Sequence, residues 1–289
     1  MKHFRTLFAT LLLVTFGIAG QLAAQENSLL WSIEGPGIKE TSYLYGTMHI
    51  LCSEYLDIPE SVSSALQSTD LLALELDMTD PQMASQMMML GMLPDGKTIM
   101  GYMNDDDTEL LDAFLRQHYG AGLDQMGTMK PFMLSSMALL PLISCEGEQE
   151  SVDGFLMMKA LANNIPVTGL ETVAFQTGLF DDIPLQDQVN ELIELVRDTD
   201  AGMEEFQRLS RLYASQNIRG MYELITEDDF WQNYKDVLLD SRNKAWIPVI
   251  EELAREQRIF IGVGAGHLAG ETGVINLLRE RGFSVNPVK

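Results

Sequence analysis

The stretch IFIGVGAGH at residues 259–267 ends an apolar, strand-like run in glycines and a histidine. A second stretch, YLYGTMH at residues 43–49, has the same design, because both end in Gly-x-x-His. Short runs rich in aliphatic and aromatic residues are typical of strands, and the residues that follow a strand end often carry function. The chain has only 4 histidines, so two of them at strand ends indicate a site. Histidine is the commonest metal ligand and the usual proton carrier near neutral pH.

Helical patterns alternate with short strand candidates along the chain. The strands expected from the sequence are residues 29–33, 43–47, 71–76, 167–170, 259–263 and 283–285. Amphipathic patterns at residues 153–163 and 247–258 predict helices between them. This alternation predicts an α/β fold with a central mixed, largely parallel sheet that is flanked by helices.

The domain organisation follows from a leader and two helical stretches. Residues 1–24 read as a signal peptide, with basic residues, an apolar run and small residues at a cleavage site. Residues 25–289 are expected to form a single domain with helical insertions at about 81–147 and 181–245, which form a possible cap over the sheet. We therefore expect a periplasmic or secreted protein with no membrane attachment after removal of the signal peptide.

The composition limits the classes of partner that the chain is expected to bind. The chain has 46% hydrophobic residues and a net charge of −23, from 19 basic and 42 acidic residues. Such a chain is globular, and its surface repels nucleic acid and anionic membranes. We expect no nucleic-acid partner. Oligomeric state does not follow from the sequence.

Two cysteines remain after the leader, Cys52 and Cys145. One interpretation is a disulfide between them in an oxidising compartment, which the sequence alone does not decide. The alternative is that Cys52, three residues after His49, is a free metal ligand.

A carboxylate stands within the expected strand at residues 71–76. Because side chains alternate along a strand, Glu75 and Asp77 share one face. A carboxylate there costs free energy unless it is paired, ligated or close to solvent. Functional groups gather at the carboxyl ends of parallel strands, so Glu75, His49 and His267 are expected to form a site for a divalent metal that activates water. The alternative is a salt bridge between Glu75 and a buried arginine.

Other polar residues stand in suggestive places. Glu171 closes the strand at residues 167–170, while Arg242 and Asn243 lie late in a helical stretch. Arg242 is a candidate for binding a carboxylate or stabilising an oxyanion, with Asn243 to position it. A helix cap or a surface ion pair is an equally good interpretation of each.

The glycines before His267 also resemble a dinucleotide-binding turn. That fingerprint needs a following βαβ unit and an acidic residue about 20 positions on. Here the next strand carries no acidic residue. We interpret the glycines instead as a tight turn that projects His267.

Taken together, these segments resemble the TraB/GumN family, in an order that matches across residues 29–288. The matching segments are residues 44–49, 74–76, 169–172 with Gln176, 242–243, and 264–268 with Gly273. The family includes the TIKI proteins, which are metal-dependent proteases acting on Wnt. It is related to the erythromycin-esterase and ChaN-like proteins, which share the expected fold.

The resemblance implies a site built around His49, Glu75 and His267. Further family elements correspond to Glu171, Arg242 and Asn243. It also implies a divalent metal, manganese or cobalt by resemblance to the TIKI proteins, with zinc as another option, and a peptide or protein substrate.

The leading hypothesis from the sequence is an exported metal-dependent hydrolase, with a peptidase favoured. In it, Glu75 is either a metal ligand or the general base, and Arg242 steadies an oxyanion. One alternative is a metal-free esterase in which a histidine activates water. Another is a non-catalytic protein that captures a peptide, haem or another ligand in the same cleft.

Overall fold

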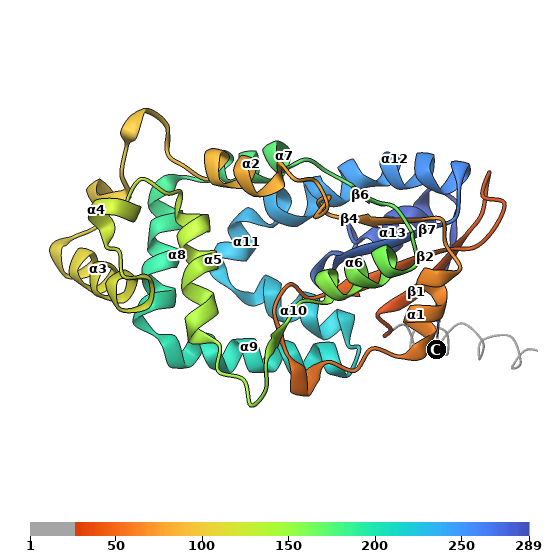
Figure 1. The fold of residues 1–289 in the computed structure, drawn as a ribbon, viewed down its shortest axis with the longest axis horizontal. Helices are drawn as coiled ribbons and strands as arrows, with labels where there is room; N and C mark the ends of the chain where they lie inside the picture. Colours follow the sequence, from red (N-terminus) through yellow and green to blue (C-terminus); the bar gives the residue numbers. More distant parts are fainter. Residues whose placement is uncertain (1–26, 289) are drawn as a thin grey trace, which may run out of the picture.

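A computed structural model describes residues 27–288, so the expected signal peptide at residues 1–24 lies outside the described part. A six-stranded sheet forms one half of the molecule (Figure 1). Its strands are β1 (Leu30–Glu34), β2 (Ser42–Thr47), β4 (Leu71–Leu74), β6 (Val167–Gly169), β7 (Ile259–Gly264) and β8 (Ser284–Pro287). All six coincide with strands expected from the sequence, which confirms the α/β prediction.

The strands lie in the order β6-β4-β7-β2-β1-β8. β6, β4, β7 and β2 pair in parallel, while β1 runs antiparallel to β2 and to β8. The sheet is therefore mixed and largely parallel, as expected. A separate ribbon joins β3 (Leu51–Cys52) to β5 (Gln149–Glu150). Two-residue strands of this kind carry no hydrophobic period, so the sequence gives no signal for them.

The strand register brings four strand ends to one edge of the sheet. Thr47 of β2 pairs with Gly264 of β7. Leu74 of β4 pairs with Gly262 of β7 and with Gly169 of β6. Residues that directly follow these strands therefore emerge side by side, as is general at the carboxyl edge of a parallel sheet.

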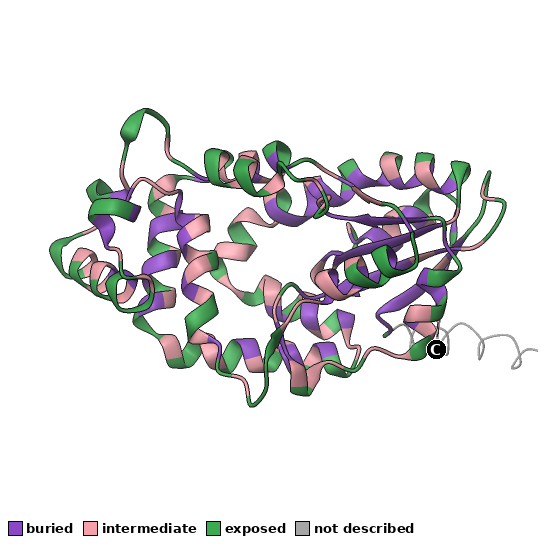
Figure 2. Cartoon of the chain, viewed as in Figure 1, coloured by how far each residue is buried: buried purple, intermediate pink, exposed green. Residues whose placement is uncertain are grey.

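Helices cover the sheet and enclose its apolar side chains. They are α1 (Glu60–Gln67), α6 (Val152–Ala162), α7 (Val173–Gly178), α12 (Ser241–Glu256) and α13 (Val274–Glu280). Helix α6 packs against β4, β6 and β7. The sheet strands are largely buried (Figure 2), with Trp31, Phe260 and Trp246 fully enclosed. Burial of this apolar area is the main force that holds the half together.

The other half of the molecule is helical and comes from the two insertions (Figure 1). The first contains α2 (Met83–Leu90), α3 (Asp105–Tyr119), α4 (Leu123–Met126) and α5 (Pro131–Leu142). The second contains α8 (Leu185–Arg197), α9 (Thr199–Ala214), α10 (Ile218–Glu227) and α11 (Asp229–Lys235). Leu111, Leu134 and Leu192 belong to a separate hydrophobic cluster between α3, α5 and α8. No helix among residues 27–288 combines the length and the apolar character needed to cross a membrane.

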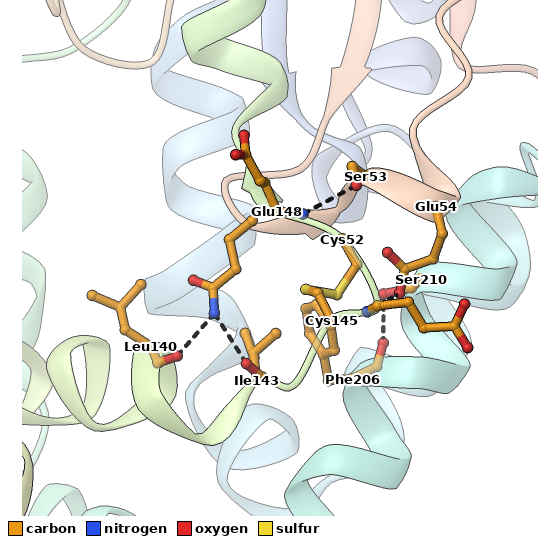
Figure 3. Close-up of a disulfide and its surroundings, with 11 residues drawn as sticks. Cys52, Ser53, Glu54, Leu140, Ile143, Cys145, Glu148, Phe206 and Ser210 are labelled. Atoms are coloured by element: carbon orange, nitrogen blue, oxygen red, sulfur yellow. Dashed lines mark hydrogen bonds between the residues drawn. A yellow bond between two sulfur atoms is a disulfide. The ribbon is translucent and has the colours of Figure 1, made fainter.

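Cys52 and Cys145 form a disulfide across 93 residues of sequence. It joins the end of β3 to the segment after α5 and lies beside Phe206 and Ser210 of α9 (Figure 3). The disulfide interpretation is confirmed. The alternative, Cys52 as a metal ligand, is wrong because its sulfur is bonded to Cys145.

Candidate metal and catalytic site

The four strand ends deliver the residues that the sequence singled out. Glu75 directly follows β4, and Glu171 lies two residues after β6. His49 lies two residues after β2, and His267 belongs to η6 (Ala265–His267), which follows β7. Residues far apart in the sequence thus meet at one sheet edge. Asp77 does not join them, because its carboxylate accepts from the amide and hydroxyl of Thr79 in an exposed turn.

Arg242 of α12 connects these residues. Its Nη2 donates to Glu75 Oε2 and to Glu171 Oε1, both at 2.6 Å. Its Nη1 lies 3.1 Å from His267 Nε2. Trp246, one turn later, donates from Nε1 to Glu171 Oε2 at 2.9 Å and packs its ring against the guanidinium. The alternative reading of Glu75, a salt bridge with a buried arginine, is therefore what the structure shows.

The local structure of α12 explains this placement. Arg242 and Trp246 are four residues apart, so they lie on the same helix face, and both are buried. The π-helical turn η5 (Asp236–Asp240) comes immediately before α12, and such turns are frequent at functional sites. Arg242 Nη1 also approaches the carbonyl of Leu238 in that turn, at 3.5 Å. With its donors so engaged, Arg242 holds the carboxylates in place rather than facing a substrate oxyanion.

Glu75 is fixed through both carboxylate oxygens. Oε1 accepts from the Gly264 amide at 2.8 Å, and Oε2 accepts from Arg242. Burial alone would raise the pKa of Glu75, but the charges of Arg242 and His49, with the Gly264 amide, hold that pKa far below its usual range. A carboxylate with so low a pKa is a weak base. Its geometry suits a ligand better than a general base.

The glycines of β7 serve close packing rather than a left-handed turn. None of Gly262, Gly264 and Gly266 has a positive φ. A Cβ on Gly262 would lie 2.8 Å from Leu74 Cδ2, so a larger residue would push β4 and β7 apart. The tight turn expected before His267 is present as η6 directly after β7, and it forms without a left-handed glycine. The Gly264 amide at the end of β7 reaches Glu75.

His267 is held as a neutral ring. Asn243 donates from Nδ2 to the Thr272 carbonyl at 2.9 Å, so its Oδ1 accepts from His267 Nδ1 at 2.7 Å. Nε2 then carries the lone pair that accepts from Arg242. Burial, together with the positive charges of Arg242 and His49, lowers the pKa of His267 to about 3, against the opposing effect of Glu75. Asn243 therefore positions His267 and not Arg242.

His49 lies in a contrasting environment. Its side chain is 65% exposed, while that of Asp153, its partner from α6, is 7% exposed. His49 Nδ1 lies 2.8 Å from Asp153 Oδ2. Neighbouring protein displaces some water and lowers the pKa of His49, but the hydrogen bond to Asp153 and the charge of Glu75 raise it to about 9. The coupling to Glu75 places His49 within electrostatic range of the Arg242 cluster.

The donor chemistry fits a divalent metal. Each histidine has its Nδ1 held by an oxygen, from Asn243 or Asp153, which is the usual outer support of a metal-binding histidine. His267 Nε2 and Glu75 Oε1 lie 4.0 Å apart. Nearby, Thr47 Oγ1 is buried without a hydrogen-bond partner among the described residues.

The distances show which ligand would have to move. In residues 27–288, one set of three His, Cys, Asp or Glu ligand atoms lies within 4.8 Å, from Cys52, Glu54 and Cys145. Its two sulfurs are consumed by the disulfide. The trio His49, Glu75 and His267 is more widely spaced, so His49 must approach the other two for all three to hold one ion.

Sequence reasoning missed the partners that orient the site. Asp153 is the first residue of the helix expected at residues 153–163, and its burial beside His49 has no sequence signal beyond the Ser151 cap of α6. Trp246 was not singled out, although its spacing of four from Arg242 places it on the same helix face. Gln176 Nε2 donates to Glu171 Oε1 at 3.1 Å and thereby helps to fix that carboxylate.

A family model described as the TraB/PrgY/gumN family matches residues 29–287. The chain belongs to the TraB/PrgY/gumN family. Its curated relatives include metalloprotease TIKI2 of Danio rerio, 33% identical over 38% of this chain and 20% of the relative. A metalloprotease TIKI homolog of Amphimedon queenslandica is 24% identical over 91% of this chain and 62% of the relative.

The chain spans only part of the length of these relatives. The longer of the two alignments covers 62% of the Amphimedon queenslandica relative. Human metalloprotease TIKI1 is 32% identical over 28% of this chain. No solved structure matches the chain. The family model thus shows membership of the family. The activity named metalloprotease is that of the relatives.

Proposed function

We propose that this member of the TraB/PrgY/gumN family is an exported, metal-dependent hydrolase that acts on peptides or proteins. The observation that carries the proposal is that His49, Glu75 and His267 follow strand ends at one sheet edge, with the Nδ1 of each histidine held by an oxygen. The metalloprotease relatives support the reaction class. The disulfide supports an oxidising compartment, where such bonds persist.

In this proposal His49, Glu75 and His267 hold the ion, and manganese, cobalt and zinc are the candidates. A divalent ion bound there would polarise a substrate carbonyl and acidify water. The surrounding charges favour a cation, since the carboxylates of Glu75, Glu171 and Asp153 outnumber the positive groups near them. Arg242 and Glu171 keep Glu75 in place, while Asn243 fixes the tautomer of His267.

The experiment is metal analysis of purified mature protein and of three variants, His49→Ala, Glu75→Gln and His267→Ala. His118→Ala is the matched control, because His118 lies on α3 against Phe114 and outside the site. We expect stoichiometric metal in the wild type and in His118→Ala, and at least tenfold weaker binding in the other variants. Equal metal in all of them, or none in the wild type, would contradict the proposal.

A peptide-library assay with each ion then tests hydrolysis. We expect cleavage that is lost on chelation and restored by one of the three ions. Cleavage that survives chelation but disappears in His49→Ala and His267→Ala would instead favour the second candidate.

That second candidate is a metal-free hydrolase. It is favoured by one contact, the 3.1 Å approach of Arg242 Nη1 to His267 Nε2, which occupies the lone pair that a metal would take. In this case His49 is protonated at neutral pH. Partial desolvation lowers its pKa, but Asp153 and Glu75 raise it to about 9. It would act as a general acid toward a leaving group.

A further inference from the structure

A cavity of about 390 Å³ lies among the insertion helices, apart from the sheet-edge cluster. Its walls come from α5, α8, α9, α11 and η5, and aromatic rings form much of them. The aromatic residues are Phe132, Phe180, Phe206, Phe230 and Trp231. Phe132 and Phe180 stack with their ring centroids 4.3 Å apart. A volume of this size is within the usual range of ligand pockets.

Two carboxylates interrupt this apolar lining, Glu191 of α8 and Glu205 of α9. None of the lining residues is basic. Neither glutamate forms an ion pair with any residue in the described part of the chain. Gln188 also lines the cavity, and its buried Oε1 has no hydrogen-bond partner there. The cavity thus offers acceptors and aromatic faces and has no positive group of its own.

The cavity adjoins the candidate site through two elements. Leu238 lines the cavity, and its carbonyl is approached by Arg242 Nη1. Phe180 lines it as well and lies one turn after Gln176, which contacts Glu171 and Glu75. The cavity wall and the candidate site thus share the η5 turn and the segment after Gln176.

We propose that this cavity binds a peptide segment in which a basic residue lies beside an apolar one. The aromatic faces attract an organic cation, with Trp the strongest ring for this purpose. Glu191 and Glu205 supply the opposite charge, and the apolar walls accept the neighbouring side chain. The inference concerns binding and does not require hydrolysis. If the chain is a peptidase, the segment bound here belongs to its substrate.

The pKa of Glu191 supports a positively charged ligand. Burial, followed by the charges of Asp228, Glu194 and Glu205, raises the pKa of Glu191 to about 7. Burial and Asp228 likewise raise the pKa of Glu205, although Arg208 opposes them. A bound cation would stabilise the ionised carboxylates. Affinity for a basic peptide is therefore expected to rise between pH 6 and pH 8.

The test compares two probes that differ only in charge, acetyl-phenylalanyl-arginine amide and its citrulline analogue. Trp231 fluorescence gives a local readout, because Trp231 lines the cavity whereas Trp31 and Trp246 do not. Isothermal calorimetry on chelator-treated protein gives the affinities without turnover. We expect the arginine peptide to bind at least tenfold more tightly than the citrulline peptide at pH 7.5. Equal affinities, or no binding of either, would overturn the inference.

Protein variants distinguish binding in the cavity from nonspecific attraction to the acidic surface. We expect Glu191→Gln and Glu205→Gln to lower the affinity for the arginine peptide at least fivefold. The affinity for the citrulline peptide is expected to stay unchanged. Glu252→Gln removes the same charge from the exposed face of α12 and is expected to change neither. A loss in Glu252→Gln equal to that in Glu191→Gln would show nonspecific attraction and reject the site. If the separate metal and cleavage assays find neither metal nor hydrolysis while the arginine peptide still binds here, the proposed function is rejected and this inference stands.

Discussion

His267 and His49 follow neighbouring parallel strands in related Gly-x-x-His segments, yet their burial and their nearest charged partners differ. His267 is buried, with Asn243 on one ring nitrogen and Arg242 on the other. His49 is 65% exposed and has a buried carboxylate, Asp153, as its partner. One ring is held neutral and the other is held charged. The motif fixes where a histidine emerges, whereas residues from distant helices fix its protonation.

The contrast also divides the site into a rigid side and an adjustable side. The rigid side consists of Glu75, Glu171, Arg242 and His267, which contact one another in the interior. The adjustable side is His49, whose ring has one partner and ample solvent. A ligand that draws the site together would therefore move His49 rather than the rigid side.

The strongest way to break the rigid side is Arg242→Ala. This change leaves two buried carboxylates without their cation, and we expect a loss of about 3–5 kcal/mol in the free energy of unfolding. Urea denaturation measures it. Arg219→Ala removes an exposed ion pair with Glu223 and is expected to cost less than about 1 kcal/mol. Similar losses in both variants would show that burial of the Arg242 cluster is not what stabilises it.

A direct comparison of the two histidines should give the next largest effect. His267→Ala removes a buried ring, leaves Asn243 Oδ1 without a partner and leaves Arg242 Nη1 only the Leu238 carbonyl at 3.5 Å, so we expect a loss of about 2–3 kcal/mol. His49→Ala removes an exposed ring but leaves the buried carboxylate of Asp153 without its partner, so a smaller loss of about 1 kcal/mol is expected. The same urea experiment, without added metal, measures both. Equal losses would contradict the division into rigid and adjustable sides.

The pH dependence of stability sharpens the comparison further. The pKa of His267 is lowered to about 3 in the folded protein by burial and positive neighbours, so the unfolded chain takes up a proton first as the solution is acidified. Its stabilising contribution is complete above about pH 6.5 and is lost as the pH falls toward 3. Between pH 6.5 and 4.5 the wild type should lose stability more steeply than His267→Ala, by at most about 1.4 kcal/mol per pH unit. Parallel profiles would show that His267 is not held neutral.

The smallest effect is expected from Asp153→Asn, which removes the carboxylate that holds the charged form of His49. NMR titration of the imidazole signals should give a pKa of about 9 for His49 in the wild type and a clearly lower pKa in the variant. His267 should stay neutral down to about pH 4 in both proteins, and His118 serves as an internal reference. An unchanged His49 titration would show that Asp153 does not hold the charged form.

The sequence was most informative where a local pattern determines the outcome. Short apolar runs predicted the six strands, and the alternation of elements predicted the parallel core that aligns His49 with His267. The partners of those residues were less accessible. No local hydrophobic period predicts how helices pack onto the sheet. The positions of Asp153 and Trp246 and the two carboxylate contacts of Arg242 depend on that packing. Glu191 and Glu205 also belong to helices from which only an apolar face can be recognised.

The pairing of β2 with β7 has a consequence for when the site can form. Ile259 donates to Ser42 Oγ across 217 residues of sequence, and the parallel register continues from there to Gly264. Contacts between such distant segments form late in folding, because a long loop must close first. A nascent chain that has not yet reached β7 lacks the strand beside which His49 must stand. During synthesis the protein therefore carries one half of its site without the other, and assembly waits for nearly the whole described chain.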